Sequence, residues 1–325
     1  MTSAPFAPRV DIIIPTFNRA HLICHAIDAA LGQSWWNTRV TVIDDGSTDD
    51  TFAACEGYFD QLRFSYIRLG RNGGTARAKN AGLLLTDGEA VTFHDSDDLP
   101  HRDKILMQVR ALIEPNMKAD ECLNWQMAGR QAGEDLSVAA ALVHHELILP
   151  DGRRVAIRKD LSLCDDVFPN LQMGSQVPGE WTHINSGLFR QELLQRNGGF
   201  ADCIEEDREF RNRLILNGEI IRVIPELLLV KIETTDSLTQ SQASGYVSTR
   251  RKADRQMVWA RVDEWRRSGR IAPEIIDFAN LEIAFVSNPQ SLALRDLPQT
   301  TATRQTLSRI YAACKGAPLH ETAAQ

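Results

Sequence analysis

Short apolar runs and amphipathic segments alternate over the amino-terminal third of the chain. Three runs, at residues 10–14, 40–43 and 90–93, are largely apolar, as in β-strands that are buried on both faces. Residues 64–69 predict a further strand between the second and third of them. Apolar residues at helical spacing occupy the segments between them, at residues 21–31, 49–59 and 76–85. This alternation predicts an α/β fold with a mostly parallel central sheet and helices on both of its faces.

Polar loops follow three of these predicted strands at the points where the strands end. The loops are Pro15-Thr16-Phe17-Asn18-Arg19, the segment from Asp44 to Asp49, and His94-Asp95-Ser96-Asp97-Asp98. In open α/β sheets, ligands bind outside the carboxyl ends of the strands. We therefore expect the three loops to converge on one ligand.

Three carboxylates, those of Asp95, Asp97 and Asp98, crowd directly after the fourth strand. They repel one another unless a cation or hydrogen-bond donors neutralise them. A hard divalent ion with oxygen ligands, Mg²⁺ or Mn²⁺, meets this need. Acidic residues also cap helices and occur in loops, so the cluster alone leaves both interpretations open.

A glycine-containing loop with basic neighbours follows the third predicted strand. Gly73 and Gly74 favour a tight turn, and Thr75 is the expected N-cap of the next helix. Arg77 and Lys79 place cations near the start of that helix, a setting suited to an anionic ligand. The alternative is a surface loop with ordinary solvated basic side chains.

Four motifs, in their order and spacing over about residues 9–105, resemble those of the family 2 glycosyltransferases. They are the segments from Ile12 to Arg19, Ile43 to Asp49, Asn72 to Gly82 and Phe93 to Asp98. The resemblance implies the GT-A fold, a Rossmann-like α/β architecture, and a sugar donor linked to a nucleotide diphosphate, expected to be UDP. It also implies Mn²⁺ or Mg²⁺ as the cofactor and inversion at the anomeric carbon of the transferred sugar.

The same resemblance assigns donor-binding roles to residues of the first half. The segment that packs on the nucleobase corresponds to Pro15, Thr16, Phe17, Asn18 and Arg19. Asp45 corresponds to the acid that hydrogen-bonds the base, with Asp44 as the alternative. The further donor-contacting positions are Asn72, Gly73, Arg77, Lys79, Asp95, Ser96 and Asp97. Lys79 stands where many relatives have Arg, which weakens the case for a bidentate contact, and Arg77 is the candidate substitute.

The metal ligands implied by the resemblance are Asp97, which is also assigned to the donor ribose, and Asp98. One position departs from the family pattern: Thr234 stands where a His commonly helps to hold metal or diphosphate. His183 or His94 is the candidate replacement, unless Asp98, the diphosphate and water suffice. A degenerate site would make the chain a nucleotide-sugar-binding pseudo-enzyme.

The second half carries the residues expected to meet the acceptor. Residues 104–113 predict an amphipathic helix, and residues 139–149 predict a strand that leads into a tight turn at 150–153. Trp181 and His183 lie in a segment that resembles the one before the acceptor site, where flat rings stack on sugars. The alternative for Trp181 is a buried core position.

A third acidic cluster opens the helix predicted to end at Gly218. Phe210 and Leu214 share one face of that helix, and Glu206 and Asp207 fall in its first turn. Acids in a first turn favour the helix dipole, which explains them without any chemistry. The resemblance instead implies that one of them is the general base that deprotonates the acceptor hydroxyl, with Asp207 first and Glu206 second.

Composition excludes some classes of function. The 325 residues include 36 Lys and Arg against 43 Asp and Glu, a net charge of −7, so no basic footprint indicates nucleic acid. Six cysteines are scattered without a paired spacing, which indicates reduced thiols and a cytoplasmic location. No secretory signal and no membrane-spanning apolar stretch is recognisable.

Beyond about residue 240 the resemblance stops, and a helical extension is expected. Residues 246–265 predict a long helix, a second helix is expected to begin at Pro273, and a third covers 303–314. Candidate buried positions of the first helix are Val247, Met257, Val258, Ala260, Val262 and Trp265. We expect packing on the catalytic domain. The alternatives are a homodimer contact and a peripheral membrane contact through Arg250, Arg251, Lys252 and Arg255.

The sequence thus predicts three parts: a nucleotide-sugar-binding half at 1–105, an acceptor-binding half at 106–240 and a helical extension at 241–325. The expected activity is transfer of a hexosyl or N-acetylhexosaminyl group to a saccharide or glycoconjugate acceptor, in polysaccharide synthesis. A sugar-1-phosphate nucleotidyltransferase is the rival enzyme. It requires a Gly-rich basic loop after the first strand, where this chain has Pro-Thr-Phe-Asn-Arg.

Overall fold

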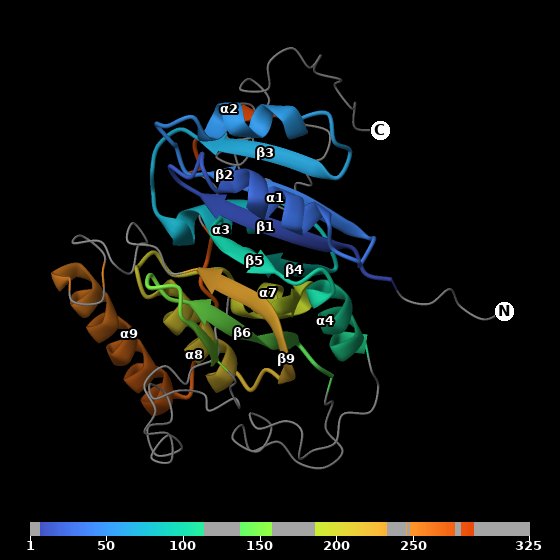
Figure 1. The fold of residues 1–325 in the computed structure, drawn as a ribbon. Helices are drawn as coiled ribbons and strands as arrows, with labels where there is room; N and C mark the ends of the chain where they lie inside the picture. The colour runs from blue at the N-terminus through green and yellow to red at the C-terminus, as the bar shows by residue number, and fades with distance from the viewer. Residues whose placement is uncertain are drawn as a thin grey trace, which may run out of the picture.

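The computed structural model describes residues 7–113, 137–157, 186–232, 245, 248–276 and 281–288. These residues form a ten-stranded sheet in the order β10-β3-β2-β1-β4-β8-β6-β9-β5, with β7 paired to β6 (Figure 1). Figure 1 shows α2 and β3 at one end of the molecule and α8 and α9 at the other. The mixed sheet with flanking helices confirms the expected α/β architecture.

The amino-terminal half supplies the parallel part of the sheet. β1 pairs in parallel with β2 and β4, and β2 pairs in parallel with β3. The strands are β1 (Val10–Thr16), β2 (Thr38–Asp44), β3 (Phe64–Leu69) and β4 (Ala90–Phe93). The helices are α1 (Ile23–Leu31), α2 (Thr51–Cys55), η1 (Glu56–Tyr58) and α3 (Thr75–Leu85). The expected alternation of strands and helices is confirmed, with the helix expected at 49–59 split into α2 and η1.

The second half extends the sheet with mixed pairing. β4 and β6 both pair antiparallel with β8, and β9 pairs in parallel with β6 and antiparallel with β5. The strands are β5 (Asp98–Pro100), β6 (Ala140–Ile148), β7 (Arg154–Ile157), β8 (Leu188–Arg190) and β9 (Ile221–Ile232). The helices are α4 (Lys104–Ile113), α7 (Gln191–Asn197) and α8 (Glu206–Leu216). The helix at 104–113 is confirmed, as is the turn at 150–153, where Gly152 adopts a φ of 81°.

Side chains of β1 alternate between two hydrophobic clusters on opposite faces of the sheet. Ile13 packs with α3 and α8, whereas Ile12 and Ile14 pack with α1 and α4. Gly82 of α3 lies directly on β1, since a Cβ there would come within 2.5 Å of Ile13 Cγ2. Helices cover both faces, so the loops at the carboxyl ends of the strands remain as the exposed edge of the sheet.

The carboxy-terminal part contributes α9 (Thr249–Ser268) and β10 (Ile283–Val286). The Ser248 side chain caps α9 by accepting a hydrogen bond from the Arg251 backbone N–H, at 3.2 Å. The long helix is therefore confirmed, displaced by about one turn. Of its expected buried positions, Val258 and Val262 are buried, Met257 and Trp265 are partly buried, and Val247 lies outside the described residues. Ala260 is exposed, so that assignment was wrong.

Two features of the carboxy-terminal part differ from expectation. Residues 273–276 do not form the helix expected to begin at Pro273; Glu274 instead makes a β-bridge with Gly198. The backbone N–H of Glu274 donates to Asn197 O and that of Gly199 donates to Glu274 O, both at 3.0 Å, and these bonds hold the segment extended. β10 was not expected, and it pairs antiparallel with the edge strand β3. The helix expected at 303–314 lies outside the described residues.

Among the described residues, no helix is both long and apolar enough to cross a membrane.

Candidate functional site

The loops after β1 and β2 are joined at the carboxyl ends of these strands. Thr16 and Asp44 are register partners at the last position of the two strands. Beyond them, the Asn18 side-chain oxygen accepts a hydrogen bond from the Thr48 backbone N–H at 2.8 Å, and the Asn18 backbone N–H donates to Ser47 Oγ at 2.9 Å. Asn18 adopts a φ of 52°, which Asn tolerates better than most residues. The expected convergence of these two loops is therefore present.

Asp44 is buried and is held by the protein itself. Its carboxylate accepts hydrogen bonds from the Ser47 backbone N–H at 2.7 Å and from the Tyr66 hydroxyl. Burial, reinforced by the Asp44 contact, raises the pKa of Tyr66 far above its usual range, so its hydroxyl remains a donor. The Asp44 carboxylate thus stabilises the conformation of the loop through these two hydrogen bonds.

Asp45 joins the second loop to the start of α3. Its carboxylate accepts from the backbone N–H groups of Gly73, at 2.9 Å, and Gly74, at 2.6 Å. Gly74 has a φ of 94° and is the N-cap of α3, which begins at Thr75, so the expectation that Thr75 is the N-cap was wrong. Burial raises the pKa of Asp45 to about 6, although the two N–H groups and Arg77 oppose the shift.

The remaining donor-side residues occupy varied positions. Phe17 is 39% exposed beside this loop pair, and Asn72 is exposed. The Arg77 side chain lies over Gly73 and donates to Arg71 O at 3.1 Å. A cleft of about 490 Å³ opens on the β3–β10 side of the second loop, and none of the predicted donor residues lines it. Its walls are Gly46, Ser47, Thr48, Phe52, Arg68, Leu69, Gly70, Ala284 and Phe285.

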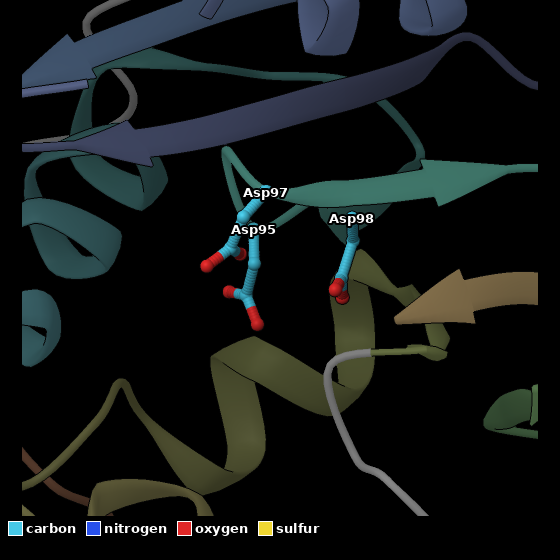
Figure 2. Close-up of side chains that lie close together, drawn as sticks. All are labelled: Asp95, Asp97 and Asp98. Carbon is cyan, nitrogen blue, oxygen red and sulfur yellow. The ribbon is translucent and has the colours of Figure 1, made fainter. Parts of the chain in front are cut away.

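The third loop brings its three carboxylates together. One oxygen from each of Asp95, Asp97 and Asp98 lies within 4.8 Å of the others, and Figure 2 shows the three side chains extending to the same side of the loop. Asp98 opens β5 and is the register partner of Lys231 on β9. The Lys231 ammonium lies 3.1 Å from Asp98 Oδ2 and 3.4 Å from Asp95 Oδ2.

The charge of this cluster is only partly balanced by Lys231. Burial raises the pKa of Asp98 to about 7, with Lys231 opposing and the neighbouring acids reinforcing the shift. Burial and the Asp95 charge also raise the pKa of Asp97. Arg19, Lys79 and Lys104 also interact electrostatically with this cluster, and the oxygens that it offers are all hard donors. This donor set therefore fits Mg²⁺ or Mn²⁺.

Glu206 and Asp207 open α8 and share one buried cation, Lys79 of α3. The Lys79 ammonium lies 2.7 Å from Asp207 Oδ1 and 3.1 Å from Glu206 Oε1, and its side chain is fully buried. Burial, with the Asp207 charge, raises the pKa of Glu206 to about 8. Phe210 and Leu214 of the same helix are both buried, as expected.

The residue before this pair anchors α8 to α9. Glu205 is buried and pairs with Arg208 of α8 and with Arg251 and Arg255 of α9, the latter two at 3.1 and 3.2 Å. The Ile204 backbone N–H donates to Asp254 Oδ2 at 2.8 Å. Two of the four basic side chains considered for membrane contact thus face Glu205.

His94 lies in the core. It is 2% exposed, and among the described residues neither of its ring nitrogens has a hydrogen-bond partner. Burial, with the nearby Lys104 charge, lowers the pKa of His94 well below its usual range. Its side chain is thus neutral. The other residues tied to the departure from the family pattern or to the acceptor, Trp181, His183 and Thr234, lie outside the described residues.

A comparison with known families bears on the first half of the site. The family model described as "Glycosyl transferase family 2" matches residues 11–127. Over these residues the chain is similar to the family 2 glycosyltransferases. This segment contains all three loops at the sheet edge and Lys79. The matched segment ends before α8, so the match gives no information on Glu206 and Asp207.

Curated relatives align over the same part of the chain. An uncharacterized glycosyltransferase from Rickettsia felis is 37% identical over 108 residues, which are 33% of this chain and 18% of that protein. An N-acetylglucosaminyltransferase from Azorhizobium caulinodans is 31% identical over 117 residues, 35% of this chain and 30% of that protein. The alignments span less than a third of these two relatives.

A solved structure matches the fold more widely. The crystal structure of S. aureus TarS residues 1–349, in complex with UDP-GlcNAc, superposes with a TM-score of 0.56 at 21% identity. The superposition covers 78% of this chain and 66% of that chain. The likeness shows the fold, which is the GT-A fold that the sequence motifs implied.

Three residues with clear roles in the site were missed by sequence reasoning. Lys231 had no assigned role, and only the β5–β9 register brings it to the acid cluster. Tyr66 was placed in a strand without any link to Asp44. Glu205 had no assigned role. The one available signal in the sequence was a lone Lys at the end of the apolar run 227–230.

Proposed function

We propose that the chain is a metal-assisted inverting glycosyltransferase. It transfers a hexosyl or N-acetylhexosaminyl group from a UDP-linked sugar to a hydroxyl of a saccharide or glycoconjugate, in the synthesis of a polysaccharide or glycoconjugate. One observation carries the proposal: Lys79, from the helix that follows the donor loop, holds Asp207 of α8, and it also lies within the field of Asp95. A donor-side acid cluster and a candidate base therefore belong to one site.

The donor nucleotide is assigned to the two joined loops. The exposed Phe17 ring offers an apolar face for the base, and Asp45 is the candidate acceptor for its N–H groups. Asp97 is assigned to the contact with the ribose of the donor. The donor-side assignments of Pro15, Thr16, Asn18, Arg19, Asp44, Asn72, Gly73, Arg77 and Ser96 rest on the resemblance to the family.

The leaving group is a nucleotide diphosphate, whose negative charge grows as the glycosidic bond breaks. Mg²⁺ or Mn²⁺, held by Asp97 and Asp98, supplies positive charge to that diphosphate when bound. Lys231 keeps Asp98 and Asp95 in place, because its ammonium hydrogen-bonds both carboxylates. Charged groups that are already held in place stabilise the developing anion, because they do not have to rearrange during the reaction.

The acceptor hydroxyl loses its proton to Asp207. A carboxylate base must be reachable from the acceptor side, and 27% of the Asp207 side chain is exposed against 9% for Glu206. Glu206, with a pKa of about 8, holds its own proton at neutral pH and is poorly suited to accept another. A base in the acceptor half and a leaving group in the donor half correspond to a single displacement, which inverts the anomeric centre.

Thermal-shift measurements against UDP-, GDP- and dTDP-linked sugars, with Mn²⁺ or with EDTA, test the proposal. A ligand that binds only the folded state raises apparent stability, so a UDP-sugar is expected to raise Tm with Mn²⁺ and much less with EDTA. Release of UDP in the presence of saccharide acceptors then reports turnover. The proposal is wrong if no nucleotide sugar changes Tm. Binding without turnover would favour a nucleotide-sugar-binding protein instead.

A further inference from the structure

Lys79 contacts two acids of the second half of the chain, although the resemblance assigns it to the donor. The resemblance assigns this position of α3 to the donor, yet the Lys79 side chain is fully buried and its ammonium contacts Glu206 and Asp207. The ammonium also lies 4.8 Å from the centroid of the Phe200 ring, a cation–π distance. Contact with a bound nucleotide would require Lys79 to leave these three partners.

Contacts of the neighbouring residue Asn80 help to keep the Lys79 ammonium in place. The next residue, Asn80, makes two hydrogen bonds of 2.8 Å with the Phe200 backbone, donating to its carbonyl and accepting from its N–H. Gly199 permits this approach, because a Cβ there would lie 2.3 Å from Asn80 Oδ1. Two successive residues of α3 therefore hold this part of the second half. Asn80 bonds the backbone of Phe200, and Lys79 contacts the two acids at the start of α8.

A buried ammonium is costly unless its partners compensate for the lost hydration. Two carboxylates and an aromatic face surround Lys79, and the shorter contact is to Asp207. Despite the opposing effect of burial, the charges of Asp207 and Glu206 raise the pKa of Lys79, so the group is a permanent cation. Its hydrogen bond to one oxygen of Asp207 restricts the rotation of that carboxylate.

We propose that Lys79 is a positioning residue for the general base, orienting the Asp207 carboxylate toward the acceptor hydroxyl, and is not a ligand of the donor. This inference rests on the proposed function. Its consequence is a division of labour within α3. Arg77, partly exposed and lying over Gly73, remains on the donor side, while Lys79, two residues later, serves the acceptor side.

The test compares Lys79→Met with Arg77→Met in the full chain. Calorimetry measures the Kd of UDP with Mn²⁺, and steady-state kinetics measure kcat and the KM of the donor. For Lys79→Met we expect an unchanged UDP Kd and a fall in kcat of about 10²-fold, the loss that a base misplaced by about 1 Å produces. For Arg77→Met we expect weaker UDP binding. Lys79→Arg, which restores a cation, is expected to recover part of kcat.

A weaker UDP Kd for Lys79→Met with kcat intact would overturn the inference and return Lys79 to the donor site. An unchanged kcat would overturn it as well. If the parent protein binds UDP-sugars but transfers none of them, the proposed function fails and the inference fails with it. That outcome is visible in the parent alone, so the two failures are distinct.

Lys79→Met leaves two facing acids without their cation, and this alone can destabilise the protein. The double variant Lys79→Met/Glu206→Gln removes the repulsion between the two acids and leaves Asp207 as the single acid at this position. We expect it to melt above Lys79→Met while kcat stays low, because Asp207 is still unheld. Full recovery of kcat in the double variant would show that Lys79 only neutralises buried charge, and would overturn the positioning role.

Discussion

Glu206 and Asp207 are neighbours in sequence but have different surroundings. Glu206 is nearly buried, and burial together with the Asp207 charge raises its pKa to about 8. Asp207 is the more exposed of the two and makes the shorter contact with Lys79. The environment therefore separates two chemically similar acids, one buried with a raised pKa and one more exposed and held by Lys79, as in enzymes that use paired acids in different roles.

Asp207→Asn is expected to abolish most transfer while leaving donor binding intact. The amide cannot accept a proton, but its oxygen can still accept the hydrogen bond from Lys79. Transfer rate should fall by about 10²–10⁴-fold, the usual contribution of a positioned base. Product release with labelled acceptor measures it, and UDP titration checks binding. Glu206→Gln is the matched control, and a larger loss there would move the role to Glu206.

Glu206 also predicts how stability varies with pH. Its usual pKa is 4.5 and its folded pKa is about 8, so between these values the unfolded chain loses a proton that the folded protein keeps. Raising the pH from 4.5 to about 8 therefore lowers the contribution of Glu206 to the free energy of unfolding. Urea unfolding at pH 5 and pH 8 is expected to show a smaller stability difference in Glu206→Gln than in the parent. An equal stability difference in both proteins would show that the pKa of Glu206 is not raised in the folded protein.

Asp45→Ala is expected to have two separable effects. Its carboxylate accepts from two N–H groups at the start of α3, so its loss should cost about 1 kcal/mol of stability, as for a lost helix cap. UDP binding should weaken because the base loses its partner. Asp45→Asn keeps an acceptor oxygen and should be milder in stability. If Asp45→Ala binds UDP as tightly as the parent, its role is confined to the cap.

Local motifs made part of the site predictable, and long-range pairing hid the rest. Asp95, Asp97 and Asp98 were recognised as a cluster because they are adjacent in sequence, and the structure keeps them together. Lys231 reaches them only through the β5–β9 register, which no local pattern encodes. Lys79 was placed near an anion from its position in α3, but which face of that helix it occupies depends on α8, more than a hundred residues away.

At the scale of elements, α8 depends on α9 for its anchorage. Glu205 is buried beneath three arginines, two of them from α9, and Arg261 of α9 contacts Glu209 of α8 at 3.3 Å. α9 has only two buried apolar residues, Val258 and Val262. Ion pairs, more than apolar burial, therefore specify how this helix sits against the acid-bearing helix.

Glu205→Ala is expected to destabilise the protein by about 3 kcal/mol. Removing one partner of a buried ion pair costs about 3–5 kcal/mol, and partly exposed Arg208 and Arg255 favour the lower end. Urea unfolding followed by circular dichroism measures the change. Arg250→Ala removes an exposed cation from the same helix and should change stability little. Equal, small effects in both variants would mean that α9 is held by its apolar contacts.

The strands of the first half were the most predictable elements, and the carboxy-terminal part the least. β3 and β4 begin and end at the predicted residues, because nearly every side chain on both faces of these strands is buried. β10 forms because the edge strand β3 offers unpaired backbone groups, which is a tertiary cause. Pro273 fits a helix start equally well by sequence, but Glu274 bonds to residues 197–199 instead.

At the scale of the whole molecule, the site lies where two halves of one sheet meet. β4 ends in the acid cluster and pairs with β8, which leads through α7 to α8. Lys79–Asp207, Lys231–Asp98 and the Asn80–Phe200 bonds all cross between the halves. In the proposed reaction, contacts between the halves therefore position both the donor-binding residues and the base.

This arrangement predicts the stereochemistry of the product. In the proposed reaction the leaving diphosphate is held by the first half and the attacking hydroxyl is deprotonated from the second, so one displacement occurs with no covalent sugar–enzyme intermediate. A donor with an α-linked sugar should therefore give a β-linked product. Proton NMR of the anomeric signal during the first turnovers measures this directly, before any mutarotation of hydrolysed sugar. An α-linked product would require a second displacement or front-face attack, and neither is compatible with Asp207 acting as a simple base.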